Sequence, residues 1–525
     1  MRHLALLLSF SVGFLSLSQE IIWVRLVSFA QGGRPQAFSL VLAAFLVGIA
    51  FGAIVGRRLC RNSQDLARAA GMVLFIAGAV DLLMLQLAPL ILPYAPLPLT
   101  LLVLAIALTA GLKGVLFPIV HHLGSQGASG QVGRSVSRIY LSNVMGSSLG
   151  PVVTGFWLLD HAGVEIAMAL IGFLTVTLGL PALAFSRRRP GIAWLAPAAL
   201  LAFGAATVAR PPAVVLPLAD SWGQDKAQIR HVIQNKHGII HVLKPPHGQG
   251  GDITFGGNAY DGRINVDLES NSNELDRAYL MAVLHPGPRR ALVVGLSTGA
   301  WTRVIEGMPG IESVKVIEIN PGYLELIRRY PEVAPLLSDP RVSIEIDDGR
   351  RWLRAHPEER FDLFFQNTTW HWRAYTTQLL SADYLREVKT HLRPDGILAS
   401  NATASLDAYR TALEVFRHVV RYKGFVYMSD SPLIKRLDAE QVLRASRIGG
   451  QPAFGDALFN GNGIAARLVH EPLQSAQDFI AGTGQAGSAE IITDMNLLPE
   501  FAPGRPPLFG WLRPLLPPTP SREAN

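Results

Sequence analysis

The sequence is nearly devoid of cysteine and poor in charge. Cys60 is the single cysteine among 525 residues, which excludes an internal disulfide framework and any metal site built from several thiolates, and we expect no bound metal. Charged residues make up 17% of the chain, against about a quarter in an average soluble protein. Hydrophobic residues make up 49% and the mean hydropathy is +0.27, so much of the chain is predicted to lie in lipid.

The first 210 residues contain the apolar segments that could cross a bilayer. We count about seven segments near the spanning length of ~20 residues. They lie at roughly 4–22, 36–56, 70–94, 96–120, 138–159, 163–185 and 192–209. The fifth is rich in small residues between Ser142 and Gly150, which predicts close helix packing.

The basic residues between these segments predict orientation in the membrane. Three basic loops alternate with loops that carry little positive charge, which places the three loops and the N-terminus in the cytoplasm. The formal charge of +7 is therefore assigned to topology and not to nucleic-acid binding. The loops carry Arg57, Arg58, Arg61 and Arg68 in the first, Lys113, Arg134 and Arg138 in the second, and Arg187, Arg188 and Arg189 in the third.

The number of spans leaves the side of the remaining chain open. An odd number would place everything after Arg210 outside, where nucleosides are scarce. The last segment is short and carries Pro197, so a re-entrant or interfacial helix is the alternative. Our working expectation is a multi-pass protein of a bacterial inner membrane with its soluble part in the cytoplasm.

Two carboxylates, Glu20 and Asp81, lie inside apolar segments, where a charge needs a partner or a function. Arg25 follows Glu20 closely, so we expect a structural ion pair there. For Asp81 both a functional role and a paired interior site stay open.

The rest of the chain is expected to hold two soluble elements. A linker and a small antiparallel β element are predicted over 211–285 from short alternating runs and turn residues. An α/β doubly wound, Rossmann-like domain follows over 286–500, and a proline-rich tail over 501–525. Together with a transmembrane domain over 1–210, this gives the expected domain organisation.

The stretch 291–318 is typical of a nucleoside-binding βαβ unit. Residues 291–294 form an apolar run without alternation, as in buried parallel strands. A turn between Gly295 and Gly299 leads into a short helix, and a second apolar run ends on Glu318. Glycines allow close backbone approach, and an acid at the end of the second strand accepts ribose hydroxyls. A plain packing turn between two strands is the alternative.

Further strand ends carry polar residues or turns. Strands are predicted over 342–346 and 362–365, and Asp348 and Asn367 follow them. Ligands of doubly wound sheets bind at the carboxyl ends of strands. Gly295, Glu318, Asp348 and Asn367 are therefore expected to line one crevice.

These motifs resemble the spermidine synthase family of polyamine aminopropyltransferases, and most closely a bacterial branch in which the S-adenosylmethionine-type domain follows a multispan membrane region. The resemblance covers most of the chain. It includes EIIWVRL at 20–26, YLSNVMG at 140–146, ITD at 492–494 and PEF at 499–501, with Met495 where the branch has a second acid. It implies decarboxylated S-adenosylmethionine or S-adenosylmethionine as substrate.

The resemblance also assigns the donor-binding residues. Glu318 matches the acid that binds the ribose hydroxyls and Asp348 the acid near the adenine amino group. Glu274 matches the glutamate of a Tyr-His-Glu run, although Ser272 and Asn273 replace its first two residues. The full set is Gly295, Ser297, Gly299, Glu318, Asp348, Gly349 and Glu274.

The largest departure is Asn367, which stands where the family has an aspartate that steers and deprotonates the attacking amine. A general base contributes ~10²–10⁴-fold to the rate, and asparagine cannot accept the proton. The resemblance thus leaves Asn367, His371, Tyr375 and Asp261 as the catalytic candidates. His371 alternatively has a structural role, and Asp261 alternatively braces its turn.

Aromatic and basic residues surround these candidates. Trp370 and Trp372 form either an aromatic wall for a cation or packing at the edge of the sheet. Arg373 disfavours a polycationic substrate and favours a carboxylate or phosphate.

Three functions are weighed. The first is a membrane-anchored aminopropyltransferase acting on an amine acceptor. The second is an S-adenosylmethionine-dependent methyltransferase or another group transferase, and the third a non-catalytic membrane protein that binds a nucleoside or polyamine. The expected partners are the lipid bilayer and a small-molecule amine, with a homodimer left open and no nucleic acid.

Overall fold

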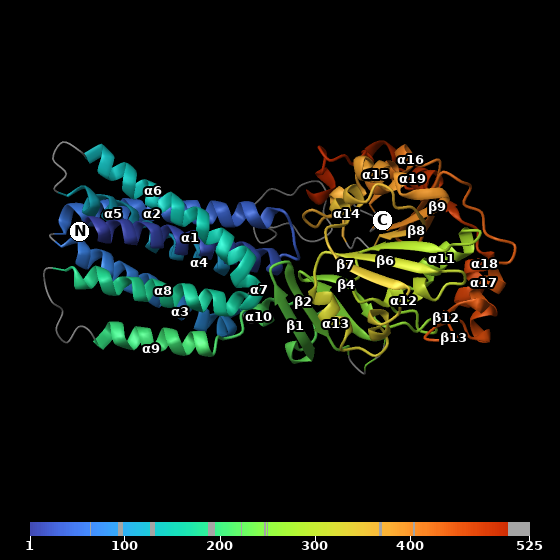
Figure 1. Cartoon of the computed structure of the whole chain (residues 1–525), viewed down its shortest axis with the longest axis horizontal. Coiled ribbons are helices and arrows are strands. Elements are labelled where there is room, and N and C mark those ends of the chain that lie inside the picture. The colour runs from blue at the N-terminus through green and yellow to red at the C-terminus, as the bar shows by residue number, and fades with distance from the viewer. Residues whose placement is uncertain are drawn as a thin grey trace. The chain divides into compact units, whose positions relative to one another are not determined.

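The computed structural model describes residues 1–63, 65–92, 98–126, 132–186, 195–221, 223–245, 248, 250–366, 370–402 and 405–501 (Figure 1). The chain forms two compact units. The helical unit holds Met1–Ala219 together with Gln234–Gly238, and the α/β unit holds Asp220–Ile233 and the described chain from Ile239 onward.

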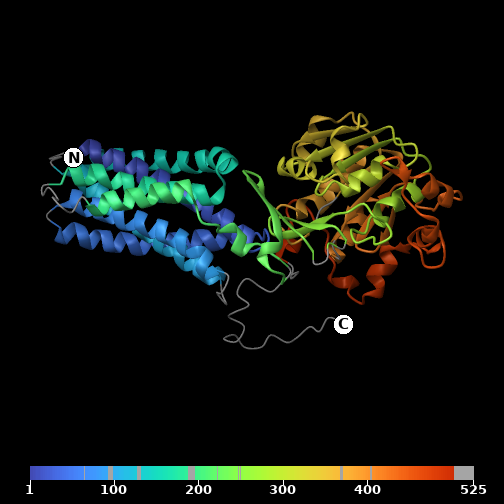
Figure 2. The same ribbon diagram turned by 90° about the horizontal axis from the view of Figure 1, so that it is seen from below.

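The helical unit is built from long helices that pack side by side, α1 on α6, α2 on α4 and α3 on α8 (Figure 2). Its elements are α1 (Arg2–Ala30), α2 (Gln36–Asn62), α3 (Leu66–Ile91), α4 (Pro98–Gly114), α5 (Leu116–Ser125), α6 (Val132–Val153), a π-helical turn (Thr154–Leu158), α7 (Leu159–His161), α8 (Gly163–Ala184), α9 (Leu195–Ala209) and α10 (Val215–Leu218).

Five helical segments among the described residues are long and apolar enough to cross a membrane, which indicates membrane association. They are α1, α2, α3, the stretch Leu99–Ser125 and α8. The segment expected at 138–159 is α6 with the turn after it. The first two turns of α6 carry Arg134 and Arg138, and the helix is rich in serine. The segment expected at 192–209 corresponds to α9, which has only 15 residues.

Glycines let these helices approach closely. A Cβ atom at Gly48 of α2 would lie 2.2 Å from the carbonyl oxygen of Ala107 in α4. A Cβ at Gly146 of α6 would lie 2.0 Å from the carbonyl oxygen of Phe10 in α1. Asn143 adds a hydrogen bond of 3.0 Å from its Nδ2 to the carbonyl oxygen of Ser9. The close packing expected for the segment between Ser142 and Gly150 is therefore confirmed.

Asp81 is a paired interior site. Lys113 Nζ lies 2.6 Å from Asp81 Oδ2, and Gln19 Nε2 donates to Asp81 Oδ1 at 2.8 Å. Lys113 also donates to Gln19 Oε1 at 2.6 Å, so the three side chains form a closed triangle, each at most 6% exposed. The assignment of Lys113 to a basic loop was wrong, because the residue lies inside α4 and neutralises a buried carboxylate.

The expected Glu20–Arg25 ion pair is also wrong. Five residues along a helix rotate the side-chain direction by about 140° relative to the first, so the two side chains leave different faces. In the described part of the helical unit, Arg25 donates instead to the carbonyl oxygen of Lys236.

The α/β unit begins with a small four-stranded sheet in the order β1-β2-β3-β4, in which β3 pairs antiparallel with both β2 and β4. Its strands are β1 (Ile229–Asn235), β2 (Gly238–Leu243), β3 (Asp252–Gly256) and β4 (Ala259–Ile264). β1 and β2 meet at residues 234–238, which belong to the helical unit.

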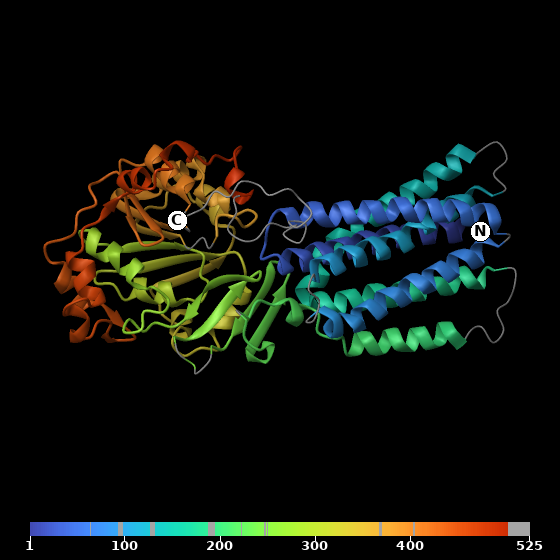
Figure 3. The same cartoon turned by 180° about the vertical axis from the view of Figure 1, so that it is seen from behind.

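The main sheet has eight strands in the order β14-β10-β11-β9-β8-β5-β6-β7. Figure 3 shows its long strands side by side with helices around them. Its elements are α11 (Asp276–Leu284), β5 (Arg290–Val294), α12 (Ala300–Glu306), β6 (Ser313–Glu318), α13 (Gly322–Ile327), β7 (Val342–Ile346), α14 (Gly349–Ala355), β8 (Phe361–Gln366), α15 (Ala382–Thr390), β9 (Leu392–Asn401), α16 (Leu406–Val415), β10 (His418–Tyr422), β11 (Phe425–Ser429), α17 (Ala439–Ala445), α18 (Ile464–His470), β14 (Gln474–Ser475) and α19 (Ala476–Gly482). A two-stranded hairpin, β12 (Arg447–Ile448) and β13 (Gln451–Pro452), stands apart from it.

The strand directions confirm the expected fold class and refine it. Strands β5 to β9 pair in parallel. β11 pairs antiparallel with β9, and β10 pairs antiparallel with β11 and β14, so the sheet is mixed. A hairpin joins β10 and β11 through a short turn, and a hairpin connection necessarily reverses the strand.

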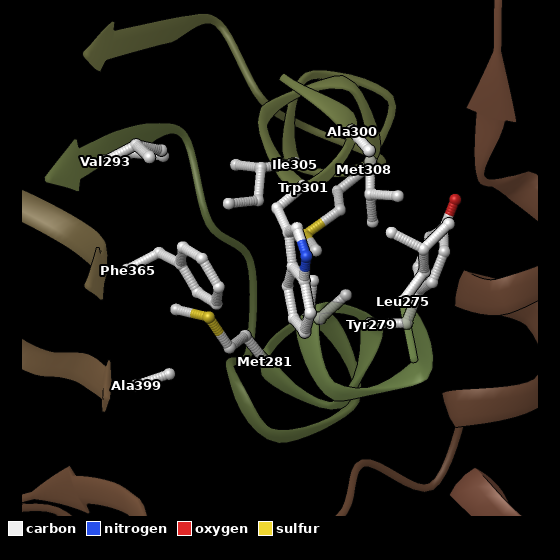
Figure 4. Packing of buried hydrophobic residues seen from close by; sticks show 14 of the residues in the cluster. Leu275, Tyr279, Met281, Val293, Ala300, Trp301, Ile305, Met308, Phe365 and Ala399 are labelled. Atoms are coloured by element: carbon white, nitrogen blue, oxygen red, sulfur yellow. The ribbon is translucent and has the colours of Figure 1, made fainter. Parts of the chain in front are cut away.

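Helices cover both faces of this sheet. Ala291 and Val293 of β5 face a core shared with α11 and α12, whereas Leu292 and Val294 face a second core shared with α15 and α16. In the first core, Trp301 lies among Met281, Ile305 and Phe365 (Figure 4). Its ring stacks on those of Phe365 and Phe425, with centroids 5.1 and 5.3 Å away. This packing explains the unbroken apolar run of β5 and fixes the end of the strand.

Candidate functional site

The turn after β5 is held in left-handed backbone conformations. Gly295, Ser297 and Gly299 have φ angles of 91°, 49° and 77°. The Gly295 N–H donates to the carbonyl oxygen of Ile317 in β6 at 2.9 Å. At Gly299 a Cβ would also lie 3.1 Å from Leu336, so both its φ and its surroundings require glycine. A strained serine in such a turn costs of order 1–3 kcal/mol and is typical of a functional site.

Glu318 ends β6 directly beside this turn and is only 4% exposed. Its Oε2 accepts the Leu296 N–H and its Oε1 accepts the Asn320 N–H, both at 2.7 Å. Burial raises the pKa of Glu318 to about 7 against the opposing effect of these N–H groups, and the charge of Asp261 adds to the rise. Each carboxylate oxygen has a second lone pair, so Glu318 can still accept hydrogen bonds from two hydroxyls.

Asp261 of β4 lies in the same cluster and is 8% exposed. Its Oδ2 accepts the hydroxyl of Tyr323, and its carbonyl oxygen accepts the Ser297 hydroxyl. Burial, reinforced by the charges of Asp261 and Glu318, raises the pKa of Tyr323 well above 10. Sequence reasoning missed Tyr323, whose only signal is its position one turn into the helix that follows Glu318.

Gly256 makes room for the Tyr323 hydroxyl. A Cβ at Gly256 would lie 2.4 Å from that oxygen and 3.2 Å from Asp261 Oδ2. The small sheet thus brings its strand β4 against the glycine turn and α13. The structure therefore brings four of the predicted residues into one cluster of hydrogen-bonded segments. These residues are Gly295, Ser297, Glu318 and Asp261.

Asp348 and Gly349 lie at the start of α14, after β7. Asp348 is exposed, and its Oδ1 caps the helix by accepting the Arg351 N–H at 2.8 Å. A Cβ at Gly349 would lie 2.7 Å from Val294 Cγ1, so glycine allows α14 to begin close against the end of β5. This contact brings the Asp348 turn next to the Gly295 turn.

Glu274 lies apart from the Glu318 cluster in its described contacts. It precedes α11 with a φ of 50° and pairs with Arg277. Its neighbour Asn273 instead brackets β4, because its amide exchanges hydrogen bonds of 3.0 and 2.8 Å with the backbone of Arg263.

The chain after β8 carries the remaining candidates. Asn367 lies outside the described residues. Trp370 donates from Nε1 to the carbonyl oxygen of Tyr260 at 2.9 Å, next to Asp261. Trp372 stacks on Trp370 and is buried, so this pair packs the interior of the segment. Arg373 lies close to Gly257, and its charge opposes the burial that raises the pKa of Tyr323.

His371 and Tyr375 have different surroundings. Burial lowers the pKa of His371, opposed by the charge of Asp407. Tyr375 is 79% exposed with a φ of 68°, and its N–H donates to Glu500 Oε1 at 3.0 Å. Among the residues that the structure describes, no group of three His, Cys, Asp or Glu side chains could hold a metal ion.

A family model and curated relatives both resemble this chain. The family model of the spermine/spermidine synthase domain matches residues 278–424. The polyamine aminopropyltransferase of Mycobacterium tuberculosis (strain ATCC 25618 / H37Rv) is 24% identical over 396 residues, which cover 73% of this chain and 74% of that protein. Polyamine aminopropyltransferase 2 of Streptomyces coelicolor is 27% identical over 429 residues, covering 76% and 74%. Both alignments are longer than the α/β unit, so they extend into the helical unit.

A solved structure also resembles about half of this chain. A spermidine synthase in complex with the transition-state analogue AdoDATO aligns with a TM-score of 0.38 and 16% identity, covering 49% of this chain and 87% of that one.

Proposed function

The chain belongs to the spermidine synthase family of transferases, and from this premise we propose that it moves an aminopropyl group from decarboxylated S-adenosylmethionine to an amine acceptor while anchored in a membrane. The observation that carries the proposal is the buried Glu318, held by two backbone N–H groups beside a strained glycine turn.

The donor is held by residues around that carboxylate. Glu318 accepts the two ribose hydroxyls through its remaining lone pairs. The turn from Gly295 to Gly299 brings backbone close to the nucleoside, with Ser297 fixed by its bond to β4. We assign Asp348 and Gly349 to the adenine side, and the contact of Gly349 with Val294 at the end of β5 supports this assignment. Glu274 is assigned to the donor by family resemblance alone.

The reaction is a displacement at carbon. The lone pair of the acceptor nitrogen forms a bond to the propyl carbon that carries the sulfonium. The carbon–sulfur bond breaks, and its electron pair stays on sulfur as the neutral thioether of methylthioadenosine. The new ammonium then loses one proton to a base. The protein must therefore hold a cationic chain and accept a proton.

Asp261 is the residue that we assign to both tasks. It is a buried carboxylate next to the glycine turn, and the Tyr323 hydroxyl orients it. Its charge pairs with a substrate ammonium, and we assign it to the acceptor side because its neighbour Tyr260 in β4 accepts the Trp370 N–H from the segment after β8. His371 is the second candidate base, because burial keeps its imidazole neutral. Tyr375 and Asn367 remain candidates for contacting the acceptor.

One observation favours a second function. Arg373 Nη2 lies 3.0 Å from where a Cβ at Gly257 would stand, and the neighbouring Gly256 faces the Tyr323 hydroxyl and Asp261, so a guanidinium stands in the region where a polyamine would bind. A cation there attracts a carboxylate, which decarboxylated S-adenosylmethionine lacks and S-adenosylmethionine carries. The second candidate is therefore an S-adenosylmethionine-dependent methyltransferase.

The products separate these functions. We would incubate the full chain, purified in detergent, with each donor and an amine panel, using Glu318→Gln as the blank. Methylthioadenosine that forms only with the decarboxylated donor and an amine supports aminopropyl transfer. S-adenosylhomocysteine would overturn that assignment in favour of methylation. Tight nucleoside binding without either product would overturn it in favour of a binding protein.

The cellular setting is also proposed. We place the chain in a bacterial inner membrane as a multi-pass protein, supported by the five apolar helices. The α/β unit lies on the side of the N-terminus if the number of crossings is even. The topology therefore depends on whether α6 and α9 each cross the membrane in addition to the five apolar segments. Two reporter fusions would test this, and each fusion would carry a reporter that is active on one side of the membrane only. We expect a fusion after Phe501 to report the cytoplasm and a fusion after Ala30 to report the outside. If a reporter that works only outside is active after Phe501, a cytoplasmic α/β unit is refuted.

A further inference from the structure

The last described residues of the chain run along the segment that follows β8. We name residues 490–501 the C-terminal strap and residues 370–382 the closing segment. The Ala382 N–H donates to the carbonyl oxygen of Ile492 at 2.8 Å, and the Tyr375 N–H donates to Glu500 Oε1 at 3.0 Å. The strap therefore contacts the closing segment at the middle of that segment, Tyr375, and at its end, Ala382.

Asp494 is the centre of these contacts. Arg350 binds it through two parallel hydrogen bonds, Nη1 to Oδ1 at 2.8 Å and Nη2 to Oδ2 at 2.6 Å. The Ser381 hydroxyl donates to the same Oδ1 at 2.7 Å. Bidentate arginine–carboxylate pairs fix geometry as well as supply energy. One carboxylate thus ties the closing segment to helix α14.

Arg350 connects this junction to the nucleoside side of the site. It follows Gly349 in the first turn of α14, and Gly349 packs against Val294 at the end of β5. Its Nε also donates to Glu387 Oε2 of α15 at 3.1 Å, which restrains the guanidinium from a second direction. The position of Asp494 is therefore set by the same helix that Asp348 caps.

The other face of the closing segment is held by strands β8 and β4. Gln366 at the end of β8 donates from Nε2 to the carbonyl oxygen of Leu379 at 2.7 Å. Trp370 donates to Tyr260, the residue before Asp261. The closing segment is consequently fixed to the acceptor side at one face and to the strap at the other.

We propose that Asp494 and Arg350 are positioning residues that hold the closing segment in register with the donor side of the site. Neither side chain touches the Glu318 cluster in the described contacts, so they act through Ser381 and the backbone of residues 375–382. The kinetic part of this proposal rests on the proposed function, whereas its structural part does not.

The pair is separable from the folding of the unit. Ile492 anchors the strap in the second core, where it is 1% exposed, and a change at Asp494 leaves that anchor in place. Asp494→Asn keeps the shape but places an amide N–H₂ against one guanidinium nitrogen, which breaks the fork. We therefore expect a local loosening of the closing segment and not global unfolding.

The test is hydrogen–deuterium exchange and steady-state kinetics on the full chain in detergent. In Asp494→Asn, peptides covering 370–382 should exchange at least about tenfold faster while peptides from β5 and β6 keep their rates. A misplacement on the scale of an ångström should lower kcat on the order of 10- to 100-fold. The KM for the donor should stay within about twofold, because the Glu318 cluster is untouched.

A matched control lies on the same helix. Arg354 pairs with Glu387 at 2.9 Å and makes no hydrogen bond to the strap among the described residues, although its charge acts on Asp494 from a distance. Arg354→Gln should therefore leave exchange and kcat unchanged. If Asp494→Asn raises exchange throughout the unit, Glu500→Ala replaces it, because among the described residues Glu500 holds the closing segment at Tyr375 alone. Unchanged exchange over 370–382 in both variants overturns the proposal, as does a control that behaves like Asp494→Asn. A wild type that turns over no donor refutes the proposed function, and the exchange result still decides the role of the strap.

Discussion

Glu318→Gln is the substitution that tests the candidate donor site most directly. The amide has the shape of the carboxyl group but carries no charge and offers one acceptor oxygen in place of two. Hydrogen bonds to a charged group contribute about 1.5–3 kcal/mol. Loss of one such bond to a ribose hydroxyl should raise the Kd for methylthioadenosine by roughly 10- to 100-fold, at 1.4 kcal/mol per tenfold.

The pH dependence gives a second and sharper signature. Burial raises the pKa of Glu318 to about 7, and the ribose hydroxyls bind the ionised form. Affinity should therefore fall as the pH drops below 7, by about tenfold at pH 6 relative to the high-pH plateau. Methylthioadenosine is neutral through this range, so the ligand adds no titration of its own. In Glu318→Gln the affinity should be flat between pH 6 and 8.

The same group affects stability, and the sign follows from the raised pKa. Between the unfolded value near 4.5 and the folded value near 7, the folded protein binds more protons than the unfolded chain. The contribution of Glu318 to the free energy of unfolding is thus present at low pH and falls by about 3 kcal/mol as the pH rises through this window. The stability of Glu318→Gln relative to wild type should accordingly rise with pH.

The assay is isothermal titration calorimetry of the full chain in detergent, with thermal unfolding followed in parallel. Glu325→Gln is the matched control, because Glu325 is an exposed glutamate on the neighbouring helix α13 that pairs with Arg329. The control should bind like the wild type at every pH. Equal affinity of Glu318→Gln and wild type, or a pH profile that the variant shares, would refute the assignment of Glu318 to the ribose.

Three further outcomes follow from the described contacts. Asp261→Asn should lower kcat by ~10²–10⁴-fold, because an amide takes no proton. The Kd for methylthioadenosine should stay within about threefold, because the amide still accepts the Tyr323 hydroxyl. An unchanged kcat would exclude Asp261 as the base. Asp81→Asn should destabilise the helical unit by about 3–5 kcal/mol in a thermal unfolding assay, because it leaves the Lys113 charge buried without its counterion. The double variant Asp81→Leu with Lys113→Leu should recover most of the loss. A single variant as stable as the wild type would contradict this prediction. Arg373→Ala should lower the KM for a polyamine acceptor at low salt, because it removes the repulsion between the guanidinium and the polyamine. At high salt the KM should stay unchanged, since screening already removes that repulsion. A higher KM in the variant would show that Arg373 contributes to acceptor binding.

The sequence by itself determined the framework of the candidate site. The run over 291–294 is apolar because β5 is buried on both faces, and that pattern is local. The glycine turn and the acid at the end of the next strand follow from backbone conformations and strand ends that short stretches encode. The fold class was predictable for the same reason, because alternation of strand and helix is visible along the chain.

The tertiary structure decided which distant side chains meet. Tyr323 pairs with Asp261 although 62 positions separate them, and no local pattern marks either as a partner. Asp494 meets Arg350 across 144 positions, and Lys113 changes from an expected loop cation to the buried partner of Asp81. Periodicity and turn chemistry act over a few residues, so the sequence predicts elements and their ends, whereas the pairing of charges and hydroxyls depends on how those elements pack.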